Sequence, residues 1–136
     1  MALLDTTVLI DLGRGTRSPV RLRAMALMDR LLDEDDTLYT SRLNEAEFRV
    51  GSFRADDPGR ETETIETVLA ATVILEFDVA SAARYAQVRA RLLDLGKPAG
   101  EVDTLVAAVA MENGQTLVTR NPKHFANITG LTVLTY

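Results

Sequence analysis

The chain has 136 residues, with 20 Asp and Glu against 15 Lys and Arg, and a formal net charge of −5. It has no Cys and one His, which excludes disulfides, cysteine nucleophiles and zinc sites with several histidines. The length predicts a single domain over residues 1–136. Because the chain shows neither a basic leader nor a long apolar run, we expect a cytoplasmic protein that does not contact membranes.

Short apolar runs alternate with longer helical patterns along the chain. In order, we expect a strand over 2–4, a helix from about Val8 that Thr6 or Thr7 caps, a helix over 19–32 closed by the acidic run 33–36, a strand over 37–40, a helix over 42–53, a turn at 57–59, a helix over 60–70, a strand over 73–77, a helix capped by Asp78 and ending at Leu95, a helix over 101–112, and strands over 116–119 and 131–134. This alternation predicts an α/β fold, with a mainly parallel sheet between two helical layers. Sites of such folds lie at the carboxyl ends of the strands.

Two acidic residues stand at informative positions in the first third of the chain. Asp5 follows the first strand directly, although a helix cap or a turn would also explain it. Glu47 shares a predicted helix face with Leu43 and Val50, whereas Glu45 points the other way and is expected to be solvated. A carboxylate on a buried stripe needs an ion pair, a proton or a bound cation.

Further polar residues follow in the last third of the chain. Asp103 lies in the first turn of an apolar helix, with Glu101 two residues earlier, and ordinary capping is the alternative interpretation. Asn121 follows the strand over 116–119, and His124 is interpreted as structural. Carboxylates converging without Cys or His suit Mg²⁺ or Mn²⁺, which activate water and neutralise charge on a phosphodiester.

The basic residues are mostly arginines, and four of them lie within ten positions. Arginine is the better phosphate ligand of the two basic side chains, so this cluster is a candidate for contacting a nucleic-acid backbone. A solvated helix face is the alternative. The cluster comprises Arg14, Arg17, Arg21 and Arg23.

Four short segments, in this order, resemble the motifs of PIN-domain ribonucleases of the VapC type, the toxins of type II toxin–antitoxin pairs. The segments are Leu3 to Ile10; Thr40-Ser41 through Glu47 to Gly51; Asp103 to Ala108; and Leu117 to Asn121 with Phe125. Gly130 to Val133 resembles the closing strand, so the resemblance covers essentially the whole chain.

The resemblance implies an α/β/α sandwich, a Mg²⁺- or Mn²⁺-dependent endoribonuclease, a homodimer and inhibition by a cognate antitoxin. It implies that Asp5, Glu47 and Asp103 are the catalytic and metal-binding acids. The supporting positions would be Thr6, Glu101, Thr119 and Asn121. Many members have Asn at the position of Thr7, so a contact from this position to Asp5 is left open. Members often have Asp at the position of Asn121, so this chain has one negative charge fewer for a second metal ion.

Three other interpretations remain open. Asp5 could be the phosphorylated aspartate of a phosphatase or a receiver domain, although it lacks the acidic neighbour that either would need. The fold could also serve as a catalytically inert binding module, for which we expect no affinity for Mn²⁺. A third possibility keeps the nuclease fold but takes DNA as its substrate.

Overall fold

The computed structural model describes residues 1–34 and 37–136. Within these residues, five strands form one parallel sheet in the order β3-β2-β1-β4-β5. They are β1 (Ala2–Leu4), β2 (Leu38–Ser41), β3 (Val73–Leu75), β4 (Thr116–Val118) and β5 (Val133–Leu134). Leu4 at the end of the central strand lies opposite Thr40 and Val118, so three strands end at the same edge.

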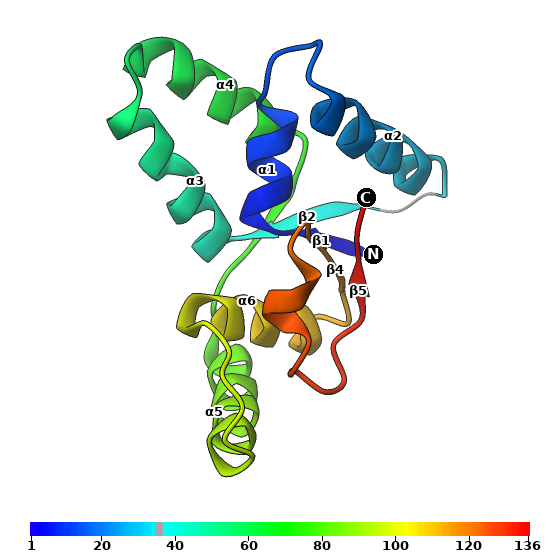
Figure 1. Cartoon of the computed structure of the whole chain (residues 1–136), viewed down its shortest axis with the longest axis vertical. Helices are drawn as coiled ribbons and strands as arrows, with labels where there is room; N and C mark the ends of the chain where they lie inside the picture. The colour runs from blue at the N-terminus through cyan, green and yellow to red at the C-terminus, as the bar shows by residue number, and fades with distance from the viewer. Residues whose placement is uncertain (35–36) are drawn as a thin grey trace.

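Helices cover both faces of the sheet (Figure 1). On one face lie α1 (Thr6–Leu12), α2 (Pro19–Asp33), α3 (Arg42–Arg54) and α4 (Pro58–Ala70). On the other face lie α5 (Val79–Asp94), α6 (Glu101–Glu112) and the 3₁₀ turn η1 (Pro122–Phe125). This arrangement confirms the predicted three-layer α/β sandwich with a parallel sheet.

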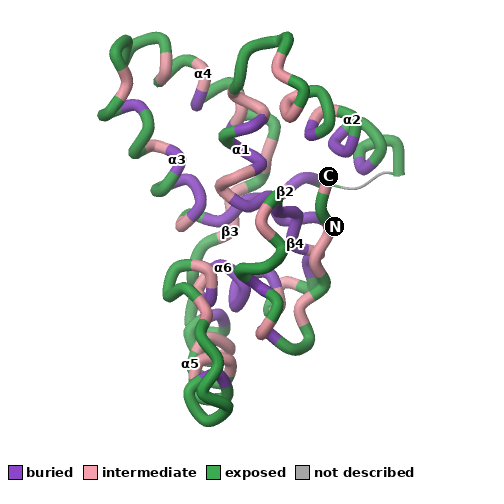
Figure 2. Tube along the Cα trace, viewed as in Figure 1, coloured by how far each residue is buried: buried purple, intermediate pink, exposed green. Residues whose placement is uncertain are grey.

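The central strand is buried on both of its faces, as Figure 2 shows. Leu4 packs with the cluster that α1, α2 and α4 contribute, whereas Leu3 packs with α6 and η1. The successive side chains of a strand point to opposite faces, so an uninterrupted apolar run is what a sheet covered on both sides requires. The predicted burial of α6 is confirmed, because Val106 to Ala110 are all buried.

Several predicted boundaries differ from the structure. Helix α1 begins at Thr6 rather than near Val8, with Asp5 instead of a threonine at its N-cap. Helix α4 begins at Pro58, because proline at the first helical position costs no hydrogen bond. Strand β1 is as predicted, β2 is shifted by one residue, β3, β4 and β5 are shorter than predicted, and η1 was not expected. In the acidic run 33–36, Asp33 is the last residue of α2, and residues 35–36 lie outside the described part of the chain.

The predicted cap of α5 is confirmed, since the Asp78 side chain accepts a hydrogen bond from the Ser81 backbone amide at 2.8 Å. No helix among the described residues is long and apolar enough to cross a membrane.

Candidate active site at the carboxyl edge of the sheet

Asp5 is the most enclosed acid at this edge, with 6% of its surface exposed. It occupies the N-cap position of α1, yet its side chain makes no capping bond. One carboxylate oxygen instead accepts from Asn44 Nδ2 at 3.2 Å, and the other accepts from Thr7 Oγ1 at 3.1 Å and Thr119 Oγ1 at 2.8 Å. These three donors fix the orientation of the Asp5 carboxylate and satisfy its buried oxygens.

The donors to Asp5 follow three strands that end at the same edge of the sheet. Thr7 lies in α1 after β1, Asn44 in the first turn of α3 after β2, and Thr119 directly after β4. The contact from Thr7, which the sequence left open, is therefore present. Sequence reasoning missed Asn44, although its place three residues after the capping Ser41 could have indicated an inward-facing amide.

Glu47 is linked to Asp5 by a chain of hydrogen bonds. Asn44 Nδ2, which binds Asp5, also donates to Thr6 Oγ1 at 3.0 Å. Thr6 Oγ1 in turn donates to Glu47 Oε2 at 2.6 Å. Glu47 lies at the surface and lines a cleft of about 490 Å³ together with Arg14 and Arg54. The structure thus places Glu47 on the exposed side of the same polar network.

The predicted buried face of α3 is wrong. The buried residues of this helix are Asn44, Glu45, Phe48 and Ser52, and Val50 is 53% exposed. Glu45 is therefore the enclosed acid, contrary to the expectation that it is solvated. It pairs with Arg42 and, at 2.8 Å, with Arg49, which also contacts Glu66. The pattern misled because polar residues with partners occupy the inward positions of α3.

Asp103 is partly buried in the first turn of α6. Burial raises the pKa of the Asp103 carboxyl, and the nearby negative charge of Asp5 raises it further, while His124 opposes both effects. His124 Nδ1 lies 3.3 Å from Asp103 Oδ2, so the interpretation of His124 as purely structural misses a contact within the site. A Cβ on Gly100 would stand 2.7 Å from that same oxygen, so a side chain at this position would displace the Asp103 carboxylate.

Two of the supporting positions are not drawn into this network. Glu101 is exposed, and the structure gives it no side-chain hydrogen bond. Asn121 donates its backbone N–H to Thr119 Oγ1 at 3.1 Å, but its side chain makes no hydrogen bond among the described residues. Thr6 and Thr119, in contrast, both contact the acids directly.

The positions and the chemistry of the acids determine whether they could hold a metal ion. Among the described residues, no three Asp, Glu or His side chains stand together closely enough to hold an ion as a set. The oxygen donors nevertheless suit Mg²⁺, which usually takes one or two carboxylates and keeps several waters. The repulsion between Asp5 and Asp103 is also what a bound cation would relieve. A hydrated ion held by two carboxylates therefore fits this site.

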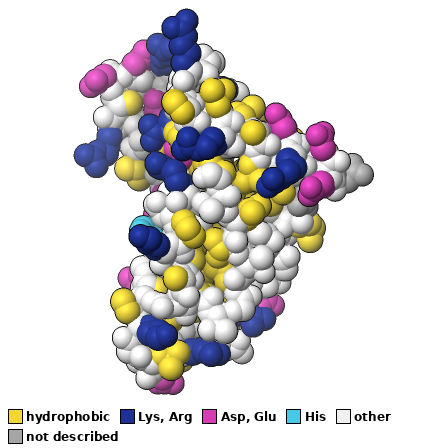
Figure 3. Space-filling view, turned by 45° about the vertical axis from the view of Figure 1, so that its right-hand side comes forward, with side chains coloured by type: hydrophobic (Ala, Val, Ile, Leu, Met, Phe, Trp, Pro, Cys, Tyr) yellow, Lys and Arg dark blue, Asp and Glu magenta, His cyan; other side chains and the backbone are white. Residues whose placement is uncertain are grey.

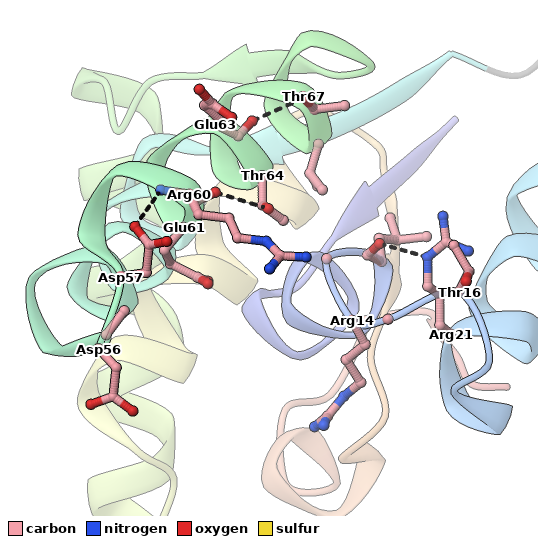
Figure 4. Close-up of a pocket in the computed structure, with 15 residues that line it drawn as sticks. Arg14, Thr16, Arg21, Asp56, Asp57, Arg60, Glu61, Glu63, Thr64 and Thr67 are labelled. Carbon is pink, nitrogen blue, oxygen red and sulfur yellow. Dashed lines mark hydrogen bonds between the residues drawn. The ribbon is translucent and has the colours of Figure 1, made fainter.

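The four clustered arginines do not form one surface. Arg14 and Arg21 line a cleft of about 780 Å³ between the loop after α1 and the start of α4, into which Arg60 also reaches (Figure 4). Arg23 lines a separate pocket beside Tyr136, and Arg17 is exposed on the loop. The larger cleft also carries Asp56, Asp57, Glu61 and Glu63, so its charge is mixed.

A third enclosed acid, which sequence reasoning missed, lies at the far end of α1. Asp11 is fully buried and accepts from Tyr136 OH at 2.7 Å. Its two oxygens lie 2.9 Å from Arg14 Nε and 2.9 Å from Arg120 Nε. Its place on the first predicted helix, six residues after Asp5, is the sequence feature that could have indicated Asp11. Asp11 joins α1 to the loop that carries Thr119 and Asn121.

Comparisons with known proteins agree with this fold. The family model for the PIN domain matches residues 2–131. The tRNA(fMet)-specific endonuclease VapC of Shigella flexneri is 28% identical over 129 residues, which are 95% of this chain and 92% of that relative.

Two solved structures show the same fold. VapBC2 from Rickettsia felis, bound to a DNA fragment from its promoter, has a chain that matches with a TM-score of 0.86 at 22% identity, covering 99% of this chain and 98% of that one. A toxin–antitoxin complex from Klebsiella pneumoniae matches with a TM-score of 0.74 at 27% identity, covering 99% and 97%. The chain belongs to the PIN-domain family, and its relatives are VapC-type members of that family.

Proposed function

We propose that this protein is a metal-dependent endoribonuclease that acts as the toxin of a toxin–antitoxin pair. The observation that carries the proposal is the buried Asp5 carboxylate, which three donors orient and whose negative charge acts on Asp103. A site of paired acids suits a hard cation and hydrolysis of a phosphodiester. The Shigella relative is named as a tRNA-specific endonuclease, which supports RNA as the substrate class.

Asp5 and Asp103 are the residues that would hold Mg²⁺ or Mn²⁺, with Glu47 acting through water or through Thr6. Such a cation, when bound, lowers the pKa of a coordinated water and offsets charge on the phosphodiester. Asn44, Thr7 and Thr119 keep both oxygens of Asp5 fixed before the ion arrives. Because the site is preorganised in this way, less free energy is needed to orient Asp5 for the reaction.

Purified protein, freed of antitoxin, should cleave cellular RNA into discrete products with Mg²⁺ or Mn²⁺. EDTA should abolish the cleavage, and so should Asp5→Asn. Asp94→Asn, which changes an exposed acid on α5, is the matched control and should cleave as the wild type does. Cleavage by the Asp5→Asn protein would indicate a contaminating nuclease. Folded wild-type protein that binds no Mn²⁺ and cleaves no RNA would favour the inert binding module.

The partners that we propose are a cognate antitoxin and a second copy of this chain. The Klebsiella structure is a toxin–antitoxin complex, which supports the first. Exposed apolar side chains, among them Phe53 at 87% and Val79 at 89%, leave surface for a protein contact. Light scattering on the isolated chain should give the mass of a dimer, and a monomer at micromolar concentration would contradict that part of the proposal.

A further inference from the structure

Asp11 contacts two arginines through the same guanidinium atom, Nε. Arg14 and Arg120 each place Nε 2.9 Å from a different oxygen of its carboxylate. Because both contacts use Nε, the two terminal nitrogens of each guanidinium are left over. Arg42 differs, since its Nε and both terminal nitrogens bind carboxylates. Within the described residues, Arg14 and Arg120 pair with no other acid.

The two guanidinium groups are fixed in place yet reach solvent. Asp11 is completely buried, whereas the side chains of Arg14 and Arg120 are 44% and 40% exposed. A buried carboxylate shared by two arginines holds them close together and removes much of their conformational freedom. Together with Asp11, the pair carries a net charge of +1 and is partly exposed to solvent.

The pair also stands next to the candidate active site. The backbone N–H of Arg120 donates to Thr7 Oγ1 at 3.1 Å, and that hydroxyl donates to Asp5. Arg14 lines the cleft that Glu47 borders, and it extends away from α4 in Figure 4. Figure 3 shows Lys and Arg side chains gathered near the middle of one face of this acidic protein. Planar, exposed guanidinium groups match the oxygens of a phosphate.

We propose that Arg14 and Arg120 form a phosphate-binding pair, oriented by Asp11, that holds the RNA strand beside the candidate active site. The inference rests on the proposed function, because it assigns a contact to that substrate. The ligand is a backbone phosphate, one or two nucleotides from the bond to be cleaved. The contact reads no base, so it strengthens binding to all RNA sequences alike.

The test is the binding of fluorescently labelled bulk tRNA in EDTA, where no cleavage occurs, followed by anisotropy across a series of salt concentrations. The variants are Arg14→Gln, Arg120→Gln and the double variant. Arg91→Gln, on the exposed side of α5, removes the same charge far from the site and is the control. Thermal melting and Mn²⁺ affinity, measured on each protein, identify any variant whose fold or acid site has changed.

Each single variant should bind tRNA about five- to tenfold more weakly, and Arg91→Gln should bind as the wild type does. The slope of log K against log salt should fall by about 0.7 for each lost phosphate contact. Mn²⁺ affinity should stay unchanged. If the folded variants keep the affinity and slope of the control, the pair does not contact phosphate and the proposal is overturned.

Measurements on the wild-type protein distinguish a failure of this inference from a failure of the proposed function. Wild-type protein that neither binds nor cleaves RNA overturns both. Wild-type protein that cleaves RNA, together with arginine variants that bind it normally, overturns only the phosphate pair. Variants that keep RNA affinity but no longer bind the antitoxin would assign the arginines to the protein partner instead, which also contradicts the proposal.

Discussion

Asp103 is the residue on which burial and a neighbouring like charge act in the same direction. Both raise the pKa of its carboxyl above the ordinary 3.8, and His124 only partly offsets them. The native protein without metal therefore binds more protons at Asp103 than the unfolded chain does as pH rises from 3.8. The contribution of Asp103 to the free energy of unfolding therefore falls as the pH rises above 3.8. Ionised Asp103 thus costs stability unless a cation relieves it.

Asp103→Asn should accordingly stabilise the protein in EDTA and at the same time remove its response to Mn²⁺. The gain over wild type should be absent at pH 3 and grow as pH rises toward 6, because the wild-type carboxyl becomes charged over that interval. Denaturant unfolding at a series of pH values measures both effects. A variant less stable than wild type at pH 6 in EDTA would contradict this account of Asp103.

Asn44 should show the opposite behaviour, because it supplies a donor that Asp5 needs. Asn44→Ala leaves one oxygen of a buried carboxylate without its partner, which costs about 1–3 kcal/mol of unfolding free energy. Asn44→Asp should cost more in EDTA, since it places a second negative charge against Asp5, and Mn²⁺ should recover part of that loss. Urea unfolding with and without Mn²⁺ gives both numbers. Equal stability of Asn44→Ala and wild type would remove Asn44 from the site.

At the scale of elements, α3 shows what the sequence could and could not predict. Its type and bounds were predicted nearly as observed, over 42–53 against Arg42–Arg54 in the structure. Its buried face did not follow, since Leu43, Ala46 and Val50 imitate a core stripe while Asn44 and Glu45 point inward. Partners from distant positions, such as Thr6 and Asp5, make those inward polar residues tolerable. A helical pattern carries no information about such partners.

The same limit applies to the site as a whole. The hydrophobic pattern predicted the order of strands and helices. Because parallel strands end at one edge of the sheet, it also predicted that the polar residues after the strands lie at that edge. Asp5 and Asn121 were placed at that edge in this way, whereas Thr119 was named only through the family resemblance. Asn44 and Asp11 were missed, because each is explained only by contacts with residues far away in the chain. The approach of Asp103 to His124 likewise became visible only in three dimensions.

Glu45 and Glu47 on α3 give a paired test of the corrected face. Glu45→Gln should cost about 1–3 kcal/mol of unfolding free energy, because Arg42 and Arg49 lose a carboxylate that is 7% exposed. Glu47→Gln, at the surface, should change stability by less than about 1 kcal/mol. RNA cleavage should respond in the reverse order, being lost with Glu47→Gln and kept with Glu45→Gln. Equal losses of stability in the two variants would contradict the assignment.

At the scale of the whole molecule, Asp11 connects parts that are far apart in the chain. It lies in α1, and its partners are Arg14 in the following loop, Arg120 after β4 and Tyr136 after β5. These contacts fasten the two strands on one side of the sheet to the helix that carries the candidate site. Tyr136 can be removed from the set without changing the charges of the proposed phosphate pair.

Tyr136→Phe should therefore lower the free energy of unfolding by about 1–2 kcal/mol, since it deletes one hydrogen bond to a buried carboxylate. Burial and the bond to Asp11 raise the pKa of the Tyr136 hydroxyl well above its ordinary 10.0. Its contribution is thus complete below pH 10 and is lost as pH rises further, because the unfolded chain releases that proton first. Above pH 10 the stabilities of wild type and Tyr136→Phe should converge in denaturant unfolding. Tyr85→Phe, on α5, should show neither the loss nor the convergence, and a constant difference between wild type and Tyr136→Phe up to pH 11 would contradict the bond to Asp11.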